Sequence, residues 1–208
     1  MAFLIHAAPR DDVPPWPGRS SRSSGLRLTG RCGLFLLLVC TLFVSFSVPR
    51  PARAETAVPG EYQVKAAFLL NFVNFVQWPD GALAEDTFTI GILGQDPFDS
   101  AVDSLKGKTV KGRRVVVRRY DDPTDARQAD VLFISASEKR VLPHILKALR
   151  GHSVLTVGDD KGFGRSGVMI NLLLLRKRVG FEINLVAAQR EGLHISSHLL
   201  KLAQEVIE

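Results

Sequence analysis

The sequence predicts an α/β fold: a single domain with a largely parallel sheet flanked by helices, a C-terminal antiparallel hairpin and a closing helix. After residue 60, short apolar runs typical of buried strands alternate with helical segments, which favours a parallel sheet. Near the C-terminus, two apolar stretches are joined by three basic residues, which indicates a hairpin. The leucine-rich end of the chain follows two serines that can cap a helix.

The first helix is expected at residues 61–77, because that segment is apolar around most of a helical circumference and is therefore predicted to be buried. Trp78-Pro79 ends it, since the residue before proline avoids the helical region. Strands are expected at 88–94, 115–117, 131–134 and 154–158, with helices at 96–105 (opened by Asp96-Pro97) and at 138–150 (capped by Ser137). The hairpin comprises 168–175 and 179–183, and the closing helix is capped by Ser196 or Ser197 and buries Leu199, Leu200, Leu202, Ala203 and Val206.

The N-terminal segment has the features of a signal peptide. Residues 32–49 lack charge, and Ala52-Arg53-Ala54 fits the A-x-A cleavage pattern. We therefore expect residues 1–54 to be a signal peptide with a long n-region, cleaved after Ala54, and residues 55–208 to be the exported domain. An uncleaved membrane anchor is the alternative, although serines and flanking prolines disfavour it.

Cleavage would change what the composition implies. The full chain has a net charge of +6, but residues 1–54 contain seven arginines and only two acidic residues, so residues 55–208 have a net charge of +1. The global argument for a nucleic-acid partner then disappears. Both cysteines, Cys32 and Cys40, lie in the segment to be removed, which excludes disulfides, thiol catalysis and cysteine metal sites in the exported domain.

Two motifs have the spacing of ligand-binding sites, but their sequence surroundings favour a structural role. Gly162-Phe163-Gly164-Arg165-Ser166-Gly167 fits the dinucleotide fingerprint, but acidic residues precede it and a strand follows it, so we predict a loop between strands. His194 and His198 have the spacing of a helical metal pair, but a cap at Ser196 or Ser197 leaves His194 outside the helix. We expect neither a cofactor nor a metal, and no serine has the surroundings of a catalytic nucleophile.

A basic stretch lies in the middle of the chain, with no acidic residue between Ser104 and Arg119. Its members are Lys106, Lys108, Lys111, Arg113, Arg114, Arg118 and Arg119. The aromatic platform of single-strand binders is missing, so we expect a solvated strand edge, with an acidic partner or an anionic membrane as the alternative.

The segment Phe181-Glu182-Ile183-Asn184 alternates apolar and polar residues. A strand places Phe181 and Ile183 on one face and Glu182 and Asn184 on the other. One interpretation is an edge strand with one wet face; the other is that Glu182 and Asn184 form part of a recognition surface. We also assign Phe163 of the glycine-rich loop to that expected partner contact.

Two blocks of residues resemble the YfiR family of bacterial periplasmic proteins. The first block, 62–72 with the following Trp78-Pro79, is similar to the opening helix of the family. The second, 181–184 with Gly192-Leu193 and 195–203, is similar to its C-terminal signature, and 167–171 fits the strand between them. The resemblance spans essentially all of residues 61–205.

The resemblance implies a non-enzymatic regulator. It implies that the domain binds the periplasmic part of an inner-membrane diguanylate cyclase and lowers cyclic-di-GMP synthesis, that an outer-membrane lipoprotein can sequester it, and that the chain can form a homodimer. The founding member relies on disulfides, and a cysteine-free exported domain excludes that form of control here. The alternative function is that of a periplasmic small-solute binder, with a pocket near Gly94 and Gly158 at the carboxyl ends of the strands.

Overall fold

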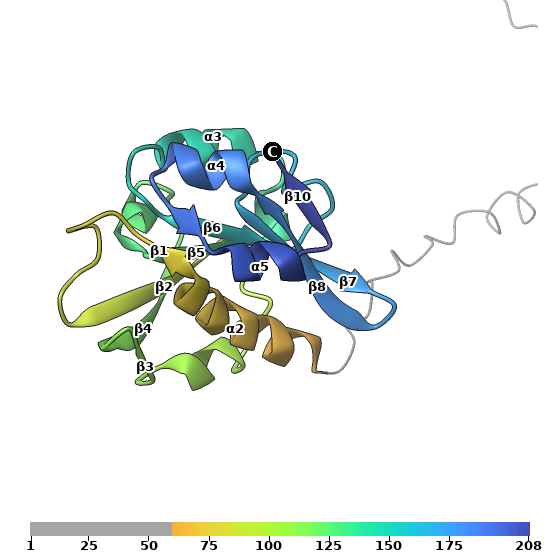
Figure 1. Ribbon diagram of the computed structural model, residues 1–208. Coiled ribbons are helices and arrows are strands. Elements are labelled where there is room, and N and C mark those ends of the chain that lie inside the picture. Colours follow the sequence, from red (N-terminus) through yellow and green to blue (C-terminus); the bar gives the residue numbers. More distant parts are fainter. Residues whose placement is uncertain (1–59) are drawn as a thin grey trace, which may run out of the picture. The chain divides into compact units, whose positions relative to one another are not determined.

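The computed structural model describes residues 60–208, which belong to one compact unit that begins at Ala54. The expected signal peptide and its cleavage site at Ala52–Ala54 lie outside the described residues. The described part has the predicted α/β architecture, with helices on both faces of one central sheet (Figure 1).

The central sheet has eight strands in the order β10-β8-β7-β6-β5-β2-β4-β3. Their bounds are β2 (Thr87–Leu93), β3 (Thr109–Val110), β4 (Arg113–Tyr120), β5 (Val131–Ile134), β6 (Leu155–Gly158), β7 (Ile170–Leu175), β8 (Arg178–Asn184) and β10 (Glu205–Ile207). The predicted strands at 88–94, 115–117, 131–134 and 154–158 are therefore confirmed. β2, β4, β5, β6 and β7 are parallel, β8 is antiparallel to β7, and β3 is antiparallel to β4.

The order of the parallel strands is that of a doubly wound sheet. The chain passes from β2 to β4 on one side and then crosses back to β5, β6 and β7 on the other. The connections after β2 and β5 therefore leave in opposite directions, and folds of this class bind ligands outside the carboxyl ends of those strands. This point defines where a ligand pocket is expected.

The first helix, α2 (Glu61–Phe72), is shorter and less buried than predicted. A 3-10 turn, η1 (Val73–Phe75), follows it, and Val76–Gln77 form a short strand, β1, that pairs with β9 (His194–Ile195). Leu69 and Phe72 are buried, but Val64 and Ala67 are exposed. The helix lies across one face of the sheet, so only one side of it is covered although most of its residues are apolar (Figure 1).

Two apolar clusters pack on the two faces of the sheet. On one face, α2 packs with residues of α4 (Leu185–Arg190), β9 and α5 (Ser197–Leu202) over the inner side of β2, β5, β6, β7 and β8. On the other face, α3 (Leu142–Ala148) and η3 (Asp125–Gln128) pack with Phe163 against the remaining strand residues. The two clusters explain why the strands are apolar on both faces rather than alternating.

One predicted helix is replaced by turns, and another is shortened. Residues 96–105 contain only the 3-10 turn η2 (Val102–Leu105), because Asp96 accepts a hydrogen bond from the Phe98 N–H and so closes a turn instead of capping a helix. In the segment 138–150, Ser135 caps the 3-10 turn η4 (Ala136–Glu138), and α3 begins only at Leu142, beside Pro143.

The C-terminal hairpin is confirmed, and its turn consists of Arg176 and Lys177, both with positive φ. The closing helix is capped by Ser196, which was one of the two predicted caps, but it ends at Leu202. Of its predicted buried residues, only Leu199 is fully buried. The chain then forms β10, which pairs in parallel with β8 and makes β8 an internal strand.

Within residues 60–208, no helix combines the length and the apolar character that a bilayer-spanning helix needs.

Candidate functional site

The predicted contact residues on β8 form a buried polar network. Glu182 and Asn184 are each 8% exposed, and because β10 covers the outer side of β8, the interpretation as a wet edge strand is wrong. Asn184 caps α4 by accepting a hydrogen bond from the Ala187 N–H, and its amide donates to the carbonyl of Gly164 at 2.8 Å. Asn184 therefore connects β8 to α4 and to the glycine-rich loop.

The loop 159–167, between β6 and β7, is held by further contacts of the same network. Asn171 is fully buried and its amide donates to the Asp160 carbonyl and to Oε1 of Glu182, both at 2.9 Å. A Cβ at Gly164 would lie 2.6 Å from that carboxylate, so only glycine fits there. Phe163 is buried among the residues of α3. The three predicted contact residues thus shape this loop, and their contact with a partner stays a prediction.

A buried ionic cluster lies where the loop leaves β6. Lys65 of α2 contacts Glu61 at 2.5 Å and Asp159 at 2.7 Å, and Tyr62 donates a hydrogen bond to the same Asp159 oxygen at 3.1 Å. Burial and the Asp159 carboxylate raise the pKa of Tyr62 to about 12. Burial alone would lower the pKa of Lys65, but the hydrogen bonds to Asp159 and Glu61 outweigh it and raise that pKa. No local sequence pattern indicates this cluster, because Lys65 and Asp159 are far apart in the chain.

A groove of about 570 Å³ opens beside this cluster. One wall is the second half of β7, Leu172–Leu175, and the other consists of Asp159–Lys161 and the first turn of α2. The groove is open to solvent and has an apolar wall facing a polar wall. It lies at the carboxyl end of β6, one strand beyond the point where the strand order reverses.

The two glycines near which a solute pocket was expected are closely packed by side chains. A Cβ at Gly94 would lie 2.5 Å from Ser137 Oγ and from a carboxylate oxygen of Glu138. The Ser137 hydroxyl accepts a hydrogen bond from the Gln95 N–H, which closes the space after β2. At Gly158, the added Cβ would meet the ring of Phe163 at 2.5 Å. Glycine at both positions is therefore explained by the close packing of neighbouring side chains.

A smaller cavity of about 190 Å³ lies between α3 and α4. Its walls include the apolar side chains of Leu146, Val154 and Met169. Arg150 and Arg190, both exposed, lie at its rim. The cavity combines an apolar interior with cationic groups, so its chemistry suits a small molecule that has an apolar body and an anionic group.

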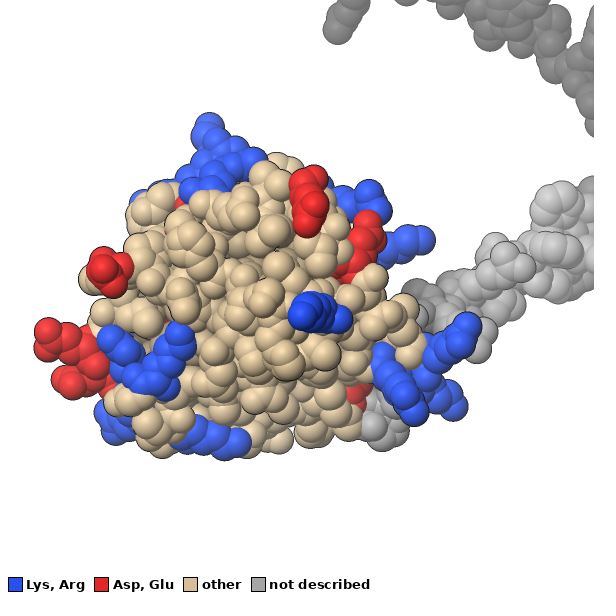
Figure 2. Space-filling view, in the orientation of Figure 1, with Lys and Arg blue, Asp and Glu red and all other residues tan. Residues whose placement is uncertain are grey.

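A broad surface with few charged residues covers the side of the molecule formed by α2 and α5. No charged residue occurs between Lys65, which is buried, and Asp80, and α5 contributes only Lys201. We define the α2–α5 face as the exposed and half-buried residues Gln63, Val64, Ala67, Phe68, Asn71, Asn74, Phe75, His198, Leu200, Lys201 and Leu202. Figure 2 shows this region mostly in tan, with one basic group inside it and the other charged groups gathered at its margins. Val64 is 46% and Leu202 54% exposed.

The two helices of this face are connected by ring stacking. The ring of Phe75 in η1 stacks on the imidazole of His198 in α5, with centroids 5.5 Å apart. His194 lies on β9 outside α5, as expected from the cap at Ser196. Among the described residues, no group of three His, Cys, Asp or Glu side chains could hold a metal ion. The charge-free segment 66–79 was visible in the sequence, but its apolar composition was interpreted as that of a buried helix.

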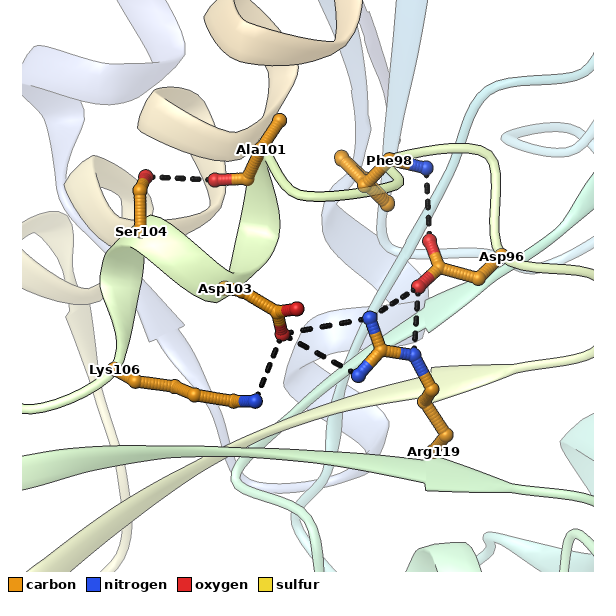
Figure 3. A network of polar contacts seen from close by, with 7 residues as sticks. All are labelled: Asp96, Phe98, Ala101, Asp103, Ser104, Lys106 and Arg119. Carbon is orange, nitrogen blue, oxygen red and sulfur yellow. Dashed lines mark hydrogen bonds and ion pairs between the residues drawn. The ribbon is translucent and has the colours of Figure 1, made fainter.

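Several residues of the basic stretch make contacts with other parts of the domain. Lys111 donates to the Val76 carbonyl at 2.6 Å and lies over the ring of Trp78, and Arg113 donates to the Ala84 carbonyl. Arg119 contacts Asp96 and Asp103 in the exposed network of Figure 3. These partners reduce the charge available for a polyanion. The glycine-rich motif forms turns that lead into β7, so the predicted loop between strands is confirmed.

The chain is similar to two solved structures at low identity. One is a conserved domain protein from Vibrio cholerae, 12% identical, with a TM-score of 0.49 over 70% of this chain and 60% of that one. The other is an ABC domain from Streptococcus pneumonia in complex with L-Trp, 13% identical, with a TM-score of 0.49 over 68% of this chain and 60% of that one. The chain thus spans about 60% of the length of each.

The comparison with family models gives the identity of the domain. The YfiR/HmsC-like model matches residues 62–204, which include every described element from α2 to α5. The match covers more than half of the chain and both blocks of residues on which the resemblance was based. The chain belongs to the YfiR/HmsC-like family.

Proposed function

We propose that the domain is a non-enzymatic periplasmic regulator, exported with cleavage after Ala54, that binds the periplasmic part of an inner-membrane diguanylate cyclase. Binding inhibits the cyclase and lowers cyclic-di-GMP, and an outer-membrane lipoprotein competes for the regulator. Membership in the YfiR/HmsC-like family supports the class of function.

The single observation that supports protein binding most strongly is the α2–α5 face. Protein interfaces are depleted of charged residues at their centre and enriched in aromatic ones. The face includes Phe68 and Phe75 and only one charged residue, Lys201, while the other charged groups in this view lie at its margin (Figure 2). Exposed and half-buried apolar side chains such as Val64, Phe68 and Leu202 on one face favour a protein contact. We therefore assign the cyclase contact to this face.

The predicted contact residues fit this proposal as positioning residues. Asn184 caps α4, and with Glu182 it fixes the loop that contains Phe163. Because all three side chains are buried, they act on a partner through the shape of the surface above them.

The cellular test measures cyclic-di-GMP in a strain that lacks the gene, in its parent and in a complemented strain. A rise that complementation reverses is the expected result. Unchanged cyclic-di-GMP under several growth conditions would overturn the repressor role.

A charge introduced on the α2–α5 face tests the binding surface without disturbing the fold. Val64→Glu places a carboxylate within the α2–α5 face and should raise cyclic-di-GMP as the deletion does. Val141→Glu is the matched control, because Val141 is 48% exposed and lies next to α3 on the other face of the sheet. Both variants should unfold at the wild-type temperature. Equal repression by both variants would argue against the α2–α5 face.

The cavity between α3 and α4 favours a second candidate, a periplasmic small-solute binder that presents its ligand to a sensor or transporter. Native mass spectrometry of the purified protein tests this candidate. A retained small molecule that is lost in Arg190→Ala would support it, and protein free of any ligand after gentle purification would argue against it.

A further inference from the structure

The second half of β7 has a strand on only one side. Its pairing with β8 continues to Leu175, at the turn of the hairpin. Its pairing with β6 covers only Ile170 and Asn171, because the chain leaves the sheet after Gly158. Among residues 60–208, no strand pairs with Leu172–Leu175 on that side. The hairpin extends beyond the rest of the sheet in Figure 1.

The register between β7 and β8 determines which backbone groups of β7 can form hydrogen bonds with another strand. Arg176 and Lys177 form a two-residue turn with φ of 48° and 66°, and Leu175 pairs with Arg178. Residues that flank such a turn exchange both hydrogen bonds with each other, and the direction alternates along the strand. Leu173 and Leu175 therefore bond to β8, whereas the N–H and C=O of Leu174 point away from it, into the groove.

The side chains and charges around this edge differ from those at the opposite edge of the sheet. β4 presents Arg118 and Arg119 along its outer side, a common protection against strand pairing, whereas Leu174 and Leu175 are apolar and 41% and 42% exposed. Cations surround the open edge: Arg176, Lys177 and Arg178 form the tip, and none of them has an ion pair within the described part of the chain.

The opposite wall does not cancel this charge. Glu61 and Asp159 both contact Lys65, and Asp160 contacts Lys139; together with Lys161 this wall has three carboxylates and three cations, and so no net charge. The groove therefore offers one unpaired strand edge, two exposed leucines and an excess of positive charge. These features suit a segment of extended backbone with apolar and acidic side chains.

We propose that the outer edge of β7 binds an extended segment of a partner protein, with alternating apolar and acidic residues, by β-strand addition. The segment lies antiparallel or parallel to Leu172–Leu175, bonds to the backbone of Leu174 and places its carboxylates toward the tip of the hairpin. A second copy of the chain fits less well: in antiparallel pairing, its own turn would reach the level of Asn171, where β6 already lies. The inference does not depend on the identity of the cyclase.

The test uses a fluorescein-labelled octapeptide that alternates Val and Glu, titrated with the exported chain and followed by fluorescence anisotropy. A peptide that alternates Val and Lys is the charge control. Leu174→Pro removes the outward N–H without breaking a bond to β8, so the variant should keep its fold, as checked by circular dichroism. Leu174→Ala keeps that N–H and serves as the matched control.

The Val-Glu peptide should bind, and the Val-Lys peptide should bind at least about tenfold more weakly. Leu174→Pro should reduce the affinity at least about tenfold, while Leu174→Ala reduces it by less. Neutralising Arg176, Lys177 and Arg178 to Gln should weaken binding and remove most of its salt dependence.

Four outcomes would overturn the proposal. They are no binding at about 1 mM protein, binding unaffected by Leu174→Pro, self-association in sedimentation that Leu174→Pro abolishes, and tighter binding after deletion of residues 55–59. The third would assign the edge to a second copy, and the fourth to the chain's own segment before Gly60.

Discussion

Two ionic contacts in this protein have the same length and opposite surroundings. Lys65 Nζ lies 2.7 Å from Asp159, and the two side chains are 4% and 5% exposed. Arg119 lies 2.7 Å from Asp96, and these side chains are 45% and 17% exposed. Each contact joins segments that are distant in the sequence, yet their energetic consequences should differ severalfold. The contribution of an ion pair to stability therefore depends on its burial and not on the distance between its charges alone.

The reason lies in what remains when one partner is removed. A buried carboxylate that loses its cation is left in a medium that solvates it poorly. An exposed carboxylate that loses its cation is solvated by water, and the freed side chains regain conformational entropy.

The largest loss of stability is expected for Lys65→Met. The substitution keeps most of the apolar side chain but leaves Asp159 buried without its cation, and breaking a buried pair costs about 3–5 kcal/mol. Urea unfolding monitored by circular dichroism measures the change. Lys139→Met is the control, since Lys139 pairs with Asp160 at 2.9 Å but is 57% exposed. Equal unfolding free energies for the two variants would contradict the comparison.

A second substitution should restore part of that loss. In Lys65→Met with Asp159→Asn, no uncompensated charge remains at position 159, and the Tyr62 hydroxyl can still donate to the amide oxygen. The double variant should therefore be more stable than Lys65→Met alone, by about 1–3 kcal/mol. The same unfolding measurement applies. A double variant less stable than the single one would show that the two substitutions act independently.

The buried cluster also marks what the sequence could not predict. Strands such as 131–134 and the hairpin around Arg176 were predictable because an apolar run and a turn are local properties. The burial of Lys65 depends on Asp159, which is 94 positions away in the chain. A tertiary partner of this kind leaves no local pattern.

The structure of the last residues was likewise not predictable from local composition. The leucine-rich stripe predicted a longer closing helix, but the helix ends at Leu202 and Glu205–Ile207 join β8 as a parallel strand. A strand so short is defined by its neighbour in the sheet and not by its own composition. For the candidate site, the charge-free segment 66–79 was visible in the sequence, but its exposure was not, because apolar composition alone indicated burial.

Neutral buried groups should have an intermediate effect. Asn184→Ala removes the bond to the Gly164 carbonyl and the cap of α4, and leaves both partners without their hydrogen bonds. The expected cost is about 1–3 kcal/mol, measured by urea unfolding. Asn74→Ala is the control, because Asn74 is exposed. If both variants matched the wild type, the network around the loop 159–167 would be dispensable for stability.

Alkaline pH should weaken the buried cluster and leave the two ion pairs of Arg119 unchanged. The folded-state pKa of Lys65 is raised, so its contribution is complete below the unfolded pKa near 10.5 and is lost as the pH rises through the folded value. The pKa of Tyr62, raised to about 12, acts in the same direction, because unfolding releases its proton between about pH 10 and 12.

Unfolding midpoints measured from pH 8 to 11.5 test this expectation. The wild type should lose stability above about pH 10 more steeply than Lys65→Met or Tyr62→Phe. Arg119, whose pKa is raised by its two carboxylate partners against the effect of burial, stays protonated throughout. A decline of equal slope in all variants would mean that the cluster does not determine it.

The smallest effect is expected for Arg119→Ala. Arg119 joins Asp96 to Asp103, and Lys106 completes the network (Figure 3). With its side chain nearly half exposed and screened by solvent, its loss should cost less than about 1 kcal/mol, and less still at high salt. Urea unfolding at low and at high salt measures both values.

The loop around this network has a stronger anchor than its charges. Phe98 is 2% exposed and its ring packs edge-on against Phe133 and Tyr62, at 4.7 and 5.3 Å between centroids. Asp96 also accepts a hydrogen bond from the Phe98 N–H at 2.8 Å, which does not involve Arg119. Phe98→Ala should therefore destabilise the protein several times more than Arg119→Ala. If the arginine variant proved the less stable of the two, charge and not burial would hold this loop on the sheet.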